Sequence, residues 1–172
     1  YAAENRDARR QRVPVLMCPS YPGADVVSDG DWRVGSCNYA GCHHELEAPI
    51  DADNNGVLFL NSQIRYSEIL DGTTNTLFLG EKVLADKNDL GWMSGTRATL
   101  RNTGEPINVD LLLLPGRVDD VSKTVDPARQ SPQFVGGFSS RHPAMMMAAF
   151  GDGHVGPITD RIKPEILQQY GH

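Results

Sequence analysis

Near its end the chain reads Phe138-Ser-Ser-Arg-His142-Pro-Ala-Met-Met-Met-Ala-Ala-Phe-Gly-Asp152-Gly153-His-Val155. Within it, residues 145–150 form an apolar run of strand length. The dipeptide Asp152-Gly153 is typical of a hairpin turn, because Gly supplies a positive φ and Asp tolerates the turn. Residues 155–158 are the expected returning strand. The pattern therefore predicts an antiparallel β-hairpin close to the C-terminus.

The composition indicates one globular domain, residues 1–172, that is rich in loops and strands. Hydrophobic residues make up 40% and charged residues 22%, enough for a core in a chain of 172 residues. With 17 Gly, 11 Pro and 7% aromatic residues, the composition does not favour a helix bundle. The net charge of −6 and the lack of a basic stripe argue against nucleic-acid binding. No apolar run approaches the roughly 18 residues that span a bilayer.

Other apolar runs predict further elements. Residues 15–17, 57–60 and 76–79 are strand candidates. Residues 20–33 are punctuated by Pro, Gly and Asp and are expected to form a loop. Residues 164–170 begin with proline, which suits the first position of a short helix.

Two sequence blocks precede the hairpin. The first is Val15-Leu-Met-Cys18-Pro-Ser, and the second runs from Arg65 through Asp71-Gly72-Thr-Thr-Asn75-Thr to Gly-Glu81-Lys. Nine residues separate His142 from Asp152-Gly153. In content and order these blocks resemble the planctomycete DUF1559 family, secreted proteins with pilin-like N-termini and a closing His-x9-Asp-Gly motif. Thr74 stands where that family usually has Ser.

The resemblance implies an α+β fold, a mostly antiparallel sheet that forms a pilin-like globular head. The family's N-terminal helix spine, which would provide the only membrane attachment, is absent from this sequence. The implied function is a structural one: an extracellular or cell-surface subunit, pilin-like or pseudopilin-like, of a filament. Its partners would be other copies or other pilin-like subunits. The chain is then expected not to be an enzyme.

The motif residues are expected to be structural. Extended at about 3.3 Å per residue, the segment between His142 and Asp152 would separate them by about 30 Å, so direct contact is not expected. No Gly-x-Ser-x-Gly elbow accompanies them. A secreted hydrolase or ligand-binding protein using this pair is the weaker alternative. The residues assigned structural roles are His142, Asp152, Gly153, Asp71, Gly72, Asn75 and Glu81.

Three cysteines, an odd number, predict one disulfide and one free thiol in a secreted protein. A Cys18–Cys42 bond closes the longer loop and joins the matched N-terminal block to the segment after it, so it is favoured, with Cys37 left free. A Cys37–Cys42 bond is the alternative. Three reduced thiols would instead suit a cytosolic protein.

The segment Cys37-Asn-Tyr-Ala-Gly-Cys42-His43 offers a second interpretation. Covalent haem c normally attaches at Cys-x-x-Cys-His, and here four residues separate the cysteines. Cys37 and Cys42 would form the thioethers and His43 would be the axial ligand. An electron-transfer subunit with haem is therefore an alternative function.

A candidate calcium site lies in Asp51-Ala-Asp53-Asn-Asn55-Gly56. Asp51, Asp53 and Asn55 occupy positions 1, 3 and 5 of an EF-hand-type loop, and Gly56 occupies position 6. Position 12 is Ser62 rather than the usual Glu, so a true EF-hand is excluded. Looser Ca²⁺ binding and a plain Asx turn without metal both stay open.

Overall fold

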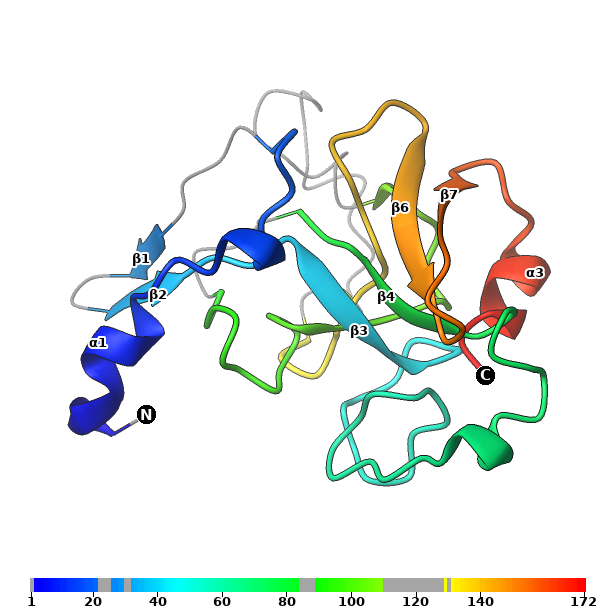
Figure 1. Ribbon diagram of the computed structural model, residues 1–172, viewed down its shortest axis with the longest axis horizontal. Coiled ribbons are helices and arrows are strands. Elements are labelled where there is room, and N and C mark those ends of the chain that lie inside the picture. The colour runs from blue at the N-terminus through cyan, green and yellow to red at the C-terminus, as the bar shows by residue number, and fades with distance from the viewer. Residues whose placement is uncertain (1, 22–25, 30–31, 84–88, 110–128, 130) are drawn as a thin grey trace.

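The structure is a computed structural model that describes residues 2–21, 26–29, 32–83, 89–109, 129 and 131–172. Its centre is a five-stranded sheet in the order β5-β3-β4-β6-β7 (Figure 1). The strands are β3 (Tyr39–His44), β4 (Leu77–Glu81), β5 (Leu100–Asn102), β6 (Met145–Phe150) and β7 (Val155–Thr159). β3 pairs in parallel with β5, and the other pairings in this sheet are antiparallel. The predicted α+β class with a mostly antiparallel sheet is confirmed.

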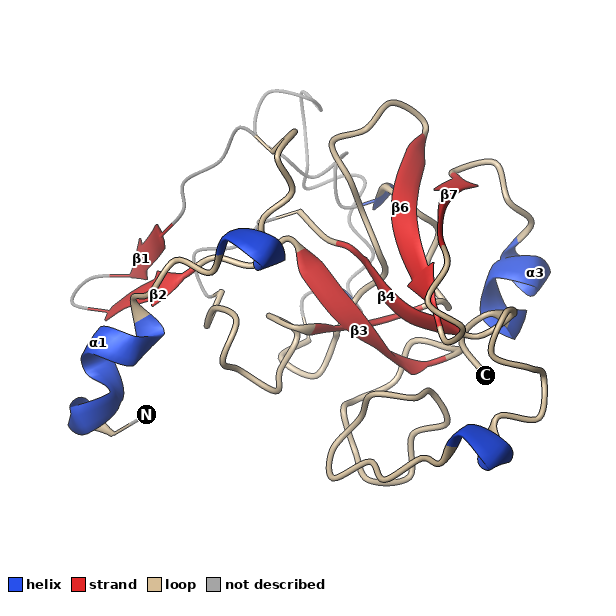
Figure 2. Ribbon diagram, in the orientation of Figure 1, coloured by secondary structure: helices blue, strands red, loops and turns tan. Residues whose placement is uncertain are grey.

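Short elements surround this sheet (Figure 2). β1 (Val26–Asp29) and β2 (Trp32–Gly35) form a separate antiparallel hairpin. The described helical segments are η1 (Ala3–Asn5), α1 (Arg6–Arg9), η2 (Pro14–Leu16), η3 (Tyr66–Glu68) and α3 (Pro164–Gln169). α1 contacts β2 at one end of the molecule, whereas α3 and the C-terminus lie at the other end (Figure 1). None of the described helices is long and apolar enough to cross a bilayer.

The predicted C-terminal hairpin is confirmed. β6 and β7 pair from Met145↔Thr159 to Ala149↔Val155. Gly153 adopts a φ of 88°, the left-handed conformation that the Asp-Gly turn requires. The ring of His154 stacks on that of Phe150, with centroids 4.4 Å apart, and fastens the turn to the strand.

The core lies on one face of the sheet, here called the inner face. Because side chains alternate along a strand, Met146, Ala148 and Phe150 of β6 all point to this face and are buried. The complete cluster is Ala40, Cys42, Leu77, Ile107, Phe138, Met146, Ala148, Phe150, Ile158 and Leu167. Gly80 makes room for Phe138, since a Cβ at that position would lie 2.6 Å from its ring.

β4 contains a bulge that determines which side chains leave the core. Leu77 pairs with Phe150, but Leu79 pairs with the next residue of β6, Ala149. Phe78 is therefore an extra residue in β4. After it, Gly80 faces the core, whereas Leu79 and Glu81 project from the opposite face, here called the outer face.

Several predicted elements are wrong. Residues 14–16 form a 3₁₀ turn instead of a strand, because Pro14 stands at its start. Residues 57–60 form no regular strand, although Leu58 N–H donates to the carbonyl of Cys42 in β3. The predicted loop at residues 20–33 instead contains β1 and the first two residues of β2. The short C-terminal helix and the strand at Leu77–Glu81 are confirmed.

Candidate functional site

The outer face of β4, β6 and β7 is apolar and exposed. A row of paired residues crosses it from Gly41 through Leu79 and Ala149 to Val155. Leu79 is 42% exposed in the middle of β4, and Val155 is 63% exposed at the start of the edge strand β7. Below this row, Met147 pairs with Pro157 and Met145 with Thr159. Leu58 lies over Gly41 and is itself partly exposed, so it extends the apolar surface toward β3.

No described helix covers this surface. α1 contacts β2 in the separate hairpin, and Leu167 of α3 belongs to the core cluster on the inner face. Sheets with one apolar face exposed are unusual, and contiguous apolar patches commonly mark interaction sites. The outer face is therefore the surface of this fold that is best suited to receive an apolar partner.

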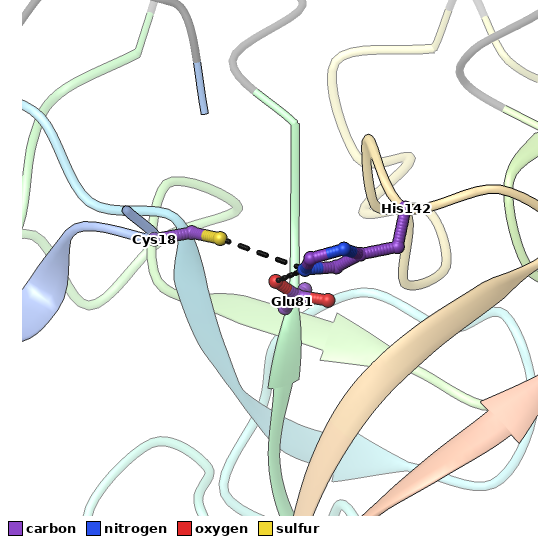
Figure 3. A group of neighbouring side chains, drawn as sticks. All are labelled: Cys18, Glu81 and His142. Carbon is purple, nitrogen blue, oxygen red and sulfur yellow. Dashed lines mark hydrogen bonds and ion pairs between the residues drawn. The ribbon is translucent and has the colours of Figure 1, made fainter. Parts of the chain in front are cut away.

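A compact polar cluster lies beside the outer face, where Cys18, Glu81 and His142 meet (Figure 3). The Nε2 atom of His142 is 3.3 Å from Oε1 of Glu81 and 3.7 Å from Sγ of Cys18. One ligand-type atom from each of the three side chains lies within 4.8 Å of the others. Glu81 is buried, whereas Cys18 and His142 are partly exposed. The cluster thus joins three segments that are far apart in the sequence.

Each member of the cluster is held by a backbone hydrogen bond. The backbone N–H of Cys18 donates to Oδ1 of the buried Asn38 (3.2 Å). The N–H of His142 donates to Oγ of Ser140 (3.0 Å). Oε2 of Glu81 accepts from the N–H of Met147 in β6 (2.7 Å), which leaves Oε1 free to face His142. The first two contacts position the backbone of Cys18 and His142, and the third orients the carboxylate of Glu81.

Electrostatics keep Cys18 protonated in the absence of a cation. Burial raises the pKa of the Cys18 thiol, and the carboxylate of Glu81 raises it further, while the backbone amides of Ser20 and Tyr21 act in the opposite direction. Burial also raises the pKa of Tyr39, with Cys18 and Glu81 adding to the effect. Cys18 is therefore not a nucleophile activated by its surroundings.

The geometry also differs from a catalytic triad. In a triad, the nucleophile contacts one nitrogen of the histidine and the carboxylate orients the ring through the other nitrogen. Here Cys18 and Glu81 both approach Nε2 of His142. The arrangement suits proton exchange between His142 and Glu81, or ligation of a cation by all three groups.

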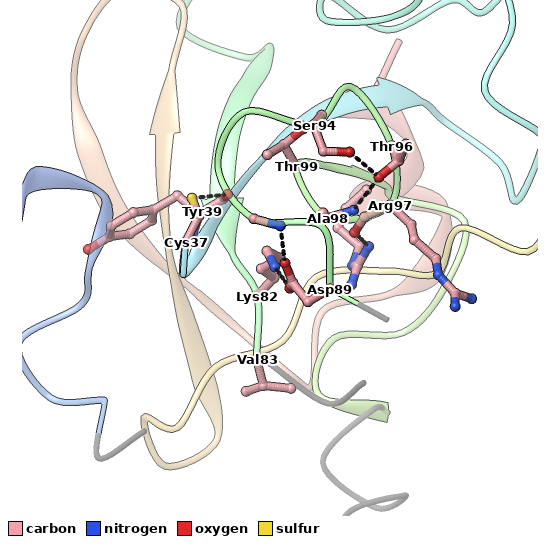
Figure 4. A network of polar contacts seen from close by, with 12 residues as sticks. Cys37, Tyr39, Lys82, Val83, Asp89, Ser94, Thr96, Arg97, Ala98 and Thr99 are labelled. Atoms are coloured by element: carbon pink, nitrogen blue, oxygen red, sulfur yellow. Dashed lines mark hydrogen bonds and ion pairs between the residues drawn. The ribbon is translucent and has the colours of Figure 1, made fainter. Parts of the chain in front are cut away.

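A second buried polar network surrounds Lys82 (Figure 4). Its side chain is fully buried, and Nζ lies 2.5 Å from Oδ2 of Asp89. Burial lowers the pKa of Lys82, and Asp89 opposes that shift. Oδ1 of Asp89 accepts from the N–H of Gly91 (2.8 Å), and Sγ of Cys37 donates to the carbonyl of Tyr39 nearby. This network anchors the segment that follows residue 88 to the end of β4.

His142 and Asp152 have separate contacts. Asp152 accepts from Oγ1 of Thr74 (3.0 Å) and from the N–H of His154 (3.0 Å), whereas His142 contacts Glu81 and Cys18. The Asp152 bonds to His154 lower the pKa of that carboxyl. The motif at the hairpin turn thus ties β6–β7 to the loop before β4.

The loop before β4 is also ordered by local bonds. Gly72 has a φ of 82°, and Nδ2 of Asn75 donates to the carbonyl of Asp71 (3.0 Å). Oδ2 of Asp71 lies 3.4 Å from Nδ1 of His172. Glu81, the last residue of this block, contacts His142.

The predicted Cys18–Cys42 disulfide is not formed, and all three cysteines are free thiols. The reason is the direction of the side chains. Cys42 belongs to the core cluster on the inner face, while Cys18 contacts His142 beside the outer face. Burial raises the pKa of Cys42 to about 12, consistent with a thiol inside the core. The alternative Cys37–Cys42 bond is not formed either.

The structure does not bring the haem candidates together. Cys42 and His43 are consecutive in β3 and point to opposite faces, so they cannot both reach one haem. His43 is buried and its Nδ1 contacts Oδ1 of Asn54 (3.1 Å). The electron-transfer alternative therefore has no geometric support.

The candidate calcium residues form an ordered turn. Oδ1 of Asp51 accepts from the N–H of Ala52, and Asp53 is exposed. The side chain of Asn55 is engaged by Glu45: Oδ1 accepts from its N–H (3.2 Å) and Nδ2 donates to its Oε1 (2.9 Å). The oxygen assigned to a metal thus already has a protein donor. Ca²⁺ binding at this turn stays a prediction.

Sequence reasoning named Cys18, Glu81 and His142 but did not predict that they meet. Each residue lies in a different one of the three blocks quoted at the start. The one feature of the sequence that could have indicated this cluster is that each block contains a residue able to bind a metal or exchange a proton. Spacing along the chain carries no information about a contact between residues 18 and 142.

Comparison with known proteins gave one match. A protein-family model described as "Protein of unknown function (DUF1559)" matches residues 1–165. No curated protein matches the chain, and no solved structure matches it.

Proposed function

Because the chain belongs to the DUF1559 family, we propose that it is the globular head of a pilin-like or pseudopilin-like subunit. Such a subunit would assemble with other copies or similar subunits into a cell-surface or secretion-associated filament. Its role is assembly rather than turnover, and its location is outside the cell.

The observation that carries this proposal is the exposed apolar outer face. A pilin-like head rests one face of its sheet on an apolar helix that forms the filament core. Leu79, Ala149 and Val155 form a row that runs across three strands, as such a contact requires. Fully burying a Leu or Val side chain contributes about 1.5–3 kcal/mol, so a helix on this row would be held firmly.

The test uses the protein as its host makes it, with charged substitutions on the outer face. Leu79→Lys and Val155→Lys place a cation on the proposed contact surface. Leu70→Lys is the matched control, because Leu70 is 92% exposed and lies in the loop before β4, off the sheet. Filaments are sheared from cells and the amount of this protein in the sheared fraction is measured.

The expected result is that the two outer-face variants disappear from the sheared fraction while Leu70→Lys remains. Circular dichroism of each purified variant checks that the fold is retained. If wild-type protein never enters the sheared fraction, or if all three variants enter it equally, the filament proposal is wrong.

A further inference from the structure

We infer that Cys18, Glu81 and His142 form a binding site for a divalent transition-metal ion, with Zn²⁺ as the ion that fits the ligand set best. Thiolate, imidazole and carboxylate are the three groups that bind Zn²⁺ in proteins. This inference does not rest on the proposed filament function.

The two distances from Nε2 of His142 to the other ligand atoms match those around a tetrahedral ion, and all three atoms lie within 4.8 Å of one another. With ordinary zinc–ligand bond lengths, neighbouring ligands lie about 3.4 Å apart for N and O and about 3.6 Å apart for N and S. In the structure Nε2 of His142 is 3.3 Å from Oε1 of Glu81 and 3.7 Å from Sγ of Cys18. Small shifts of side chains therefore suffice to admit the ion.

The three ligand atoms approach one another from three different segments of the chain. A single N–H at Nε2 points along one line, so it cannot align well with both Oε1 and Sγ. A metal ion placed between the three atoms would instead contact the lone pair of Nε2, the thiolate and the carboxylate together. The three ligand atoms lie within 4.8 Å of one another, so one cation can replace the protons that they otherwise share.

The surroundings also have the features of a prepared site. Oε2 of Glu81 is held by the N–H of Met147, and a hydrogen-bonded carboxylate is typical of metal ligands. The N–H of Cys18 donates to Oδ1 of the buried Asn38, which positions the backbone that carries the thiol. His142 and Cys18 are partly exposed, so an ion has a path from solvent and water can occupy the fourth position.

Binding is a proton–metal exchange without redox change. The S–H bond of Cys18 breaks, its proton passes to solvent, and the thiolate sulfur bonds to the ion. Glu81 and neutral His142 bind through lone pairs. Binding therefore releases the thiol proton of Cys18 to solvent.

Such a site would tie the N-terminal segment to the sheet. Cys18 precedes the β1–β2 hairpin, Glu81 ends β4, and His142 precedes β6. One ion would thus join three segments that no disulfide joins in this structure.

The experiment measures metal binding by tag-free protein kept reduced. Zn²⁺ is titrated in competition with a chromogenic chelator, and Co²⁺ serves as a spectroscopic probe. The expected result is one saturable equivalent, with a near-ultraviolet thiolate-to-cobalt band and a melting temperature that rises with added Zn²⁺.

Variants test the three ligands separately. Cys18→Ser abolishes the thiolate band, and Glu81→Gln and His142→Gln weaken Zn²⁺ binding at least about 10-fold. Glu81→Gln keeps a side-chain oxygen that can accept the hydrogen bond from the Met147 N–H, so this variant is expected to remain folded. The matched controls are His154→Gln, from another histidine–carboxylate pair, and Glu68→Gln, from an exposed carboxylate.

Two results would overturn the inference. One is wild-type protein that takes up no stoichiometric Zn²⁺ or Co²⁺. The other is binding that survives Cys18→Ser and His142→Gln, or that the control variants weaken to the same extent.

Discussion

The two faces of the central sheet are built from the same strands but differ in what they contain. On the inner face, Leu77, Met146 and Phe150 are buried against one another in a closed core. On the outer face, Leu79 and Val155 are just as apolar yet stay exposed. Apolar character alone therefore does not place a residue in the core of this protein. The inner face stabilises the fold, and the outer face is available to a partner.

The largest effect should come from shortening one leucine side chain on each face of the sheet. Leu77→Ala removes a fully buried side chain and is expected to lower the free energy of unfolding by about 2–5 kcal/mol. Leu79→Ala, two residues along the same strand, should change it by no more than about 0.5 kcal/mol. Urea unfolding of both variants measures the difference. Equal losses would mean that the outer face of the isolated protein is covered.

A smaller effect is expected from adding one methyl group at each of two glycines that pair with Ala148, one in β4 and one in β7. Gly80→Ala would place its Cβ 2.6 Å from the ring of Phe138, and such overpacking typically costs about 1–3 kcal/mol. Gly156→Ala in β7 is the matched control, because no atom lies within 4 Å of its Cβ position. Thermal melting of the two variants compares them. A Gly80→Ala protein as stable as the control would show that Phe138 moves aside freely.

The smallest effect is a pH dependence of the free energy of unfolding. It comes from His43, which is buried in β3 on the side of the sheet where β3 pairs with β5. Burial lowers the pKa of His43 below its ordinary value, and Nε2 has no hydrogen-bond partner among the described residues. The unfolded chain therefore takes up a proton near pH 6.5 while the folded chain does not. Stability should be fully present above that pH and decrease as pH falls, by at most about 1.4 kcal/mol per unit.

That pH dependence is measured by urea unfolding at pH 7.5 and 5.5. His43→Gln removes the titrating group and should flatten the decrease. An unchanged slope in His43→Gln would assign the pH dependence to another histidine.

The parts of the fold that could be predicted from the sequence are those with local signals. The apolar run of β6, the Asp152-Gly153 turn and Pro164 at the start of α3 each act through neighbours in the chain, and the structure confirms them. The bulge at Phe78 has no local signal, because it depends on how β4 aligns with β6.

The candidate metal cluster and the cysteines were beyond sequence reasoning for a similar reason. The odd count of cysteines predicted a bond but says nothing about which face of a sheet each thiol occupies. Cys42 enters the core through strand alternation, and Cys18 meets His142 through a contact across 124 positions. The positions of both cysteines depend on tertiary packing, which local sequence patterns do not reveal.

The extra residue at Phe78 determines which face of the sheet each later residue of β4 occupies. Deleting Phe78 would remove the bulge and leave Leu79, Gly80 and Glu81 on their present faces, whereas inserting one residue after Phe78 would turn the rest of the strand over. Glu81 would then point into the apolar core, and the ammonium of Lys82 would leave Asp89 for solvent. The count of residues in this short strand therefore matters as well as their identity, and a one-codon insertion here would do more damage than most substitutions.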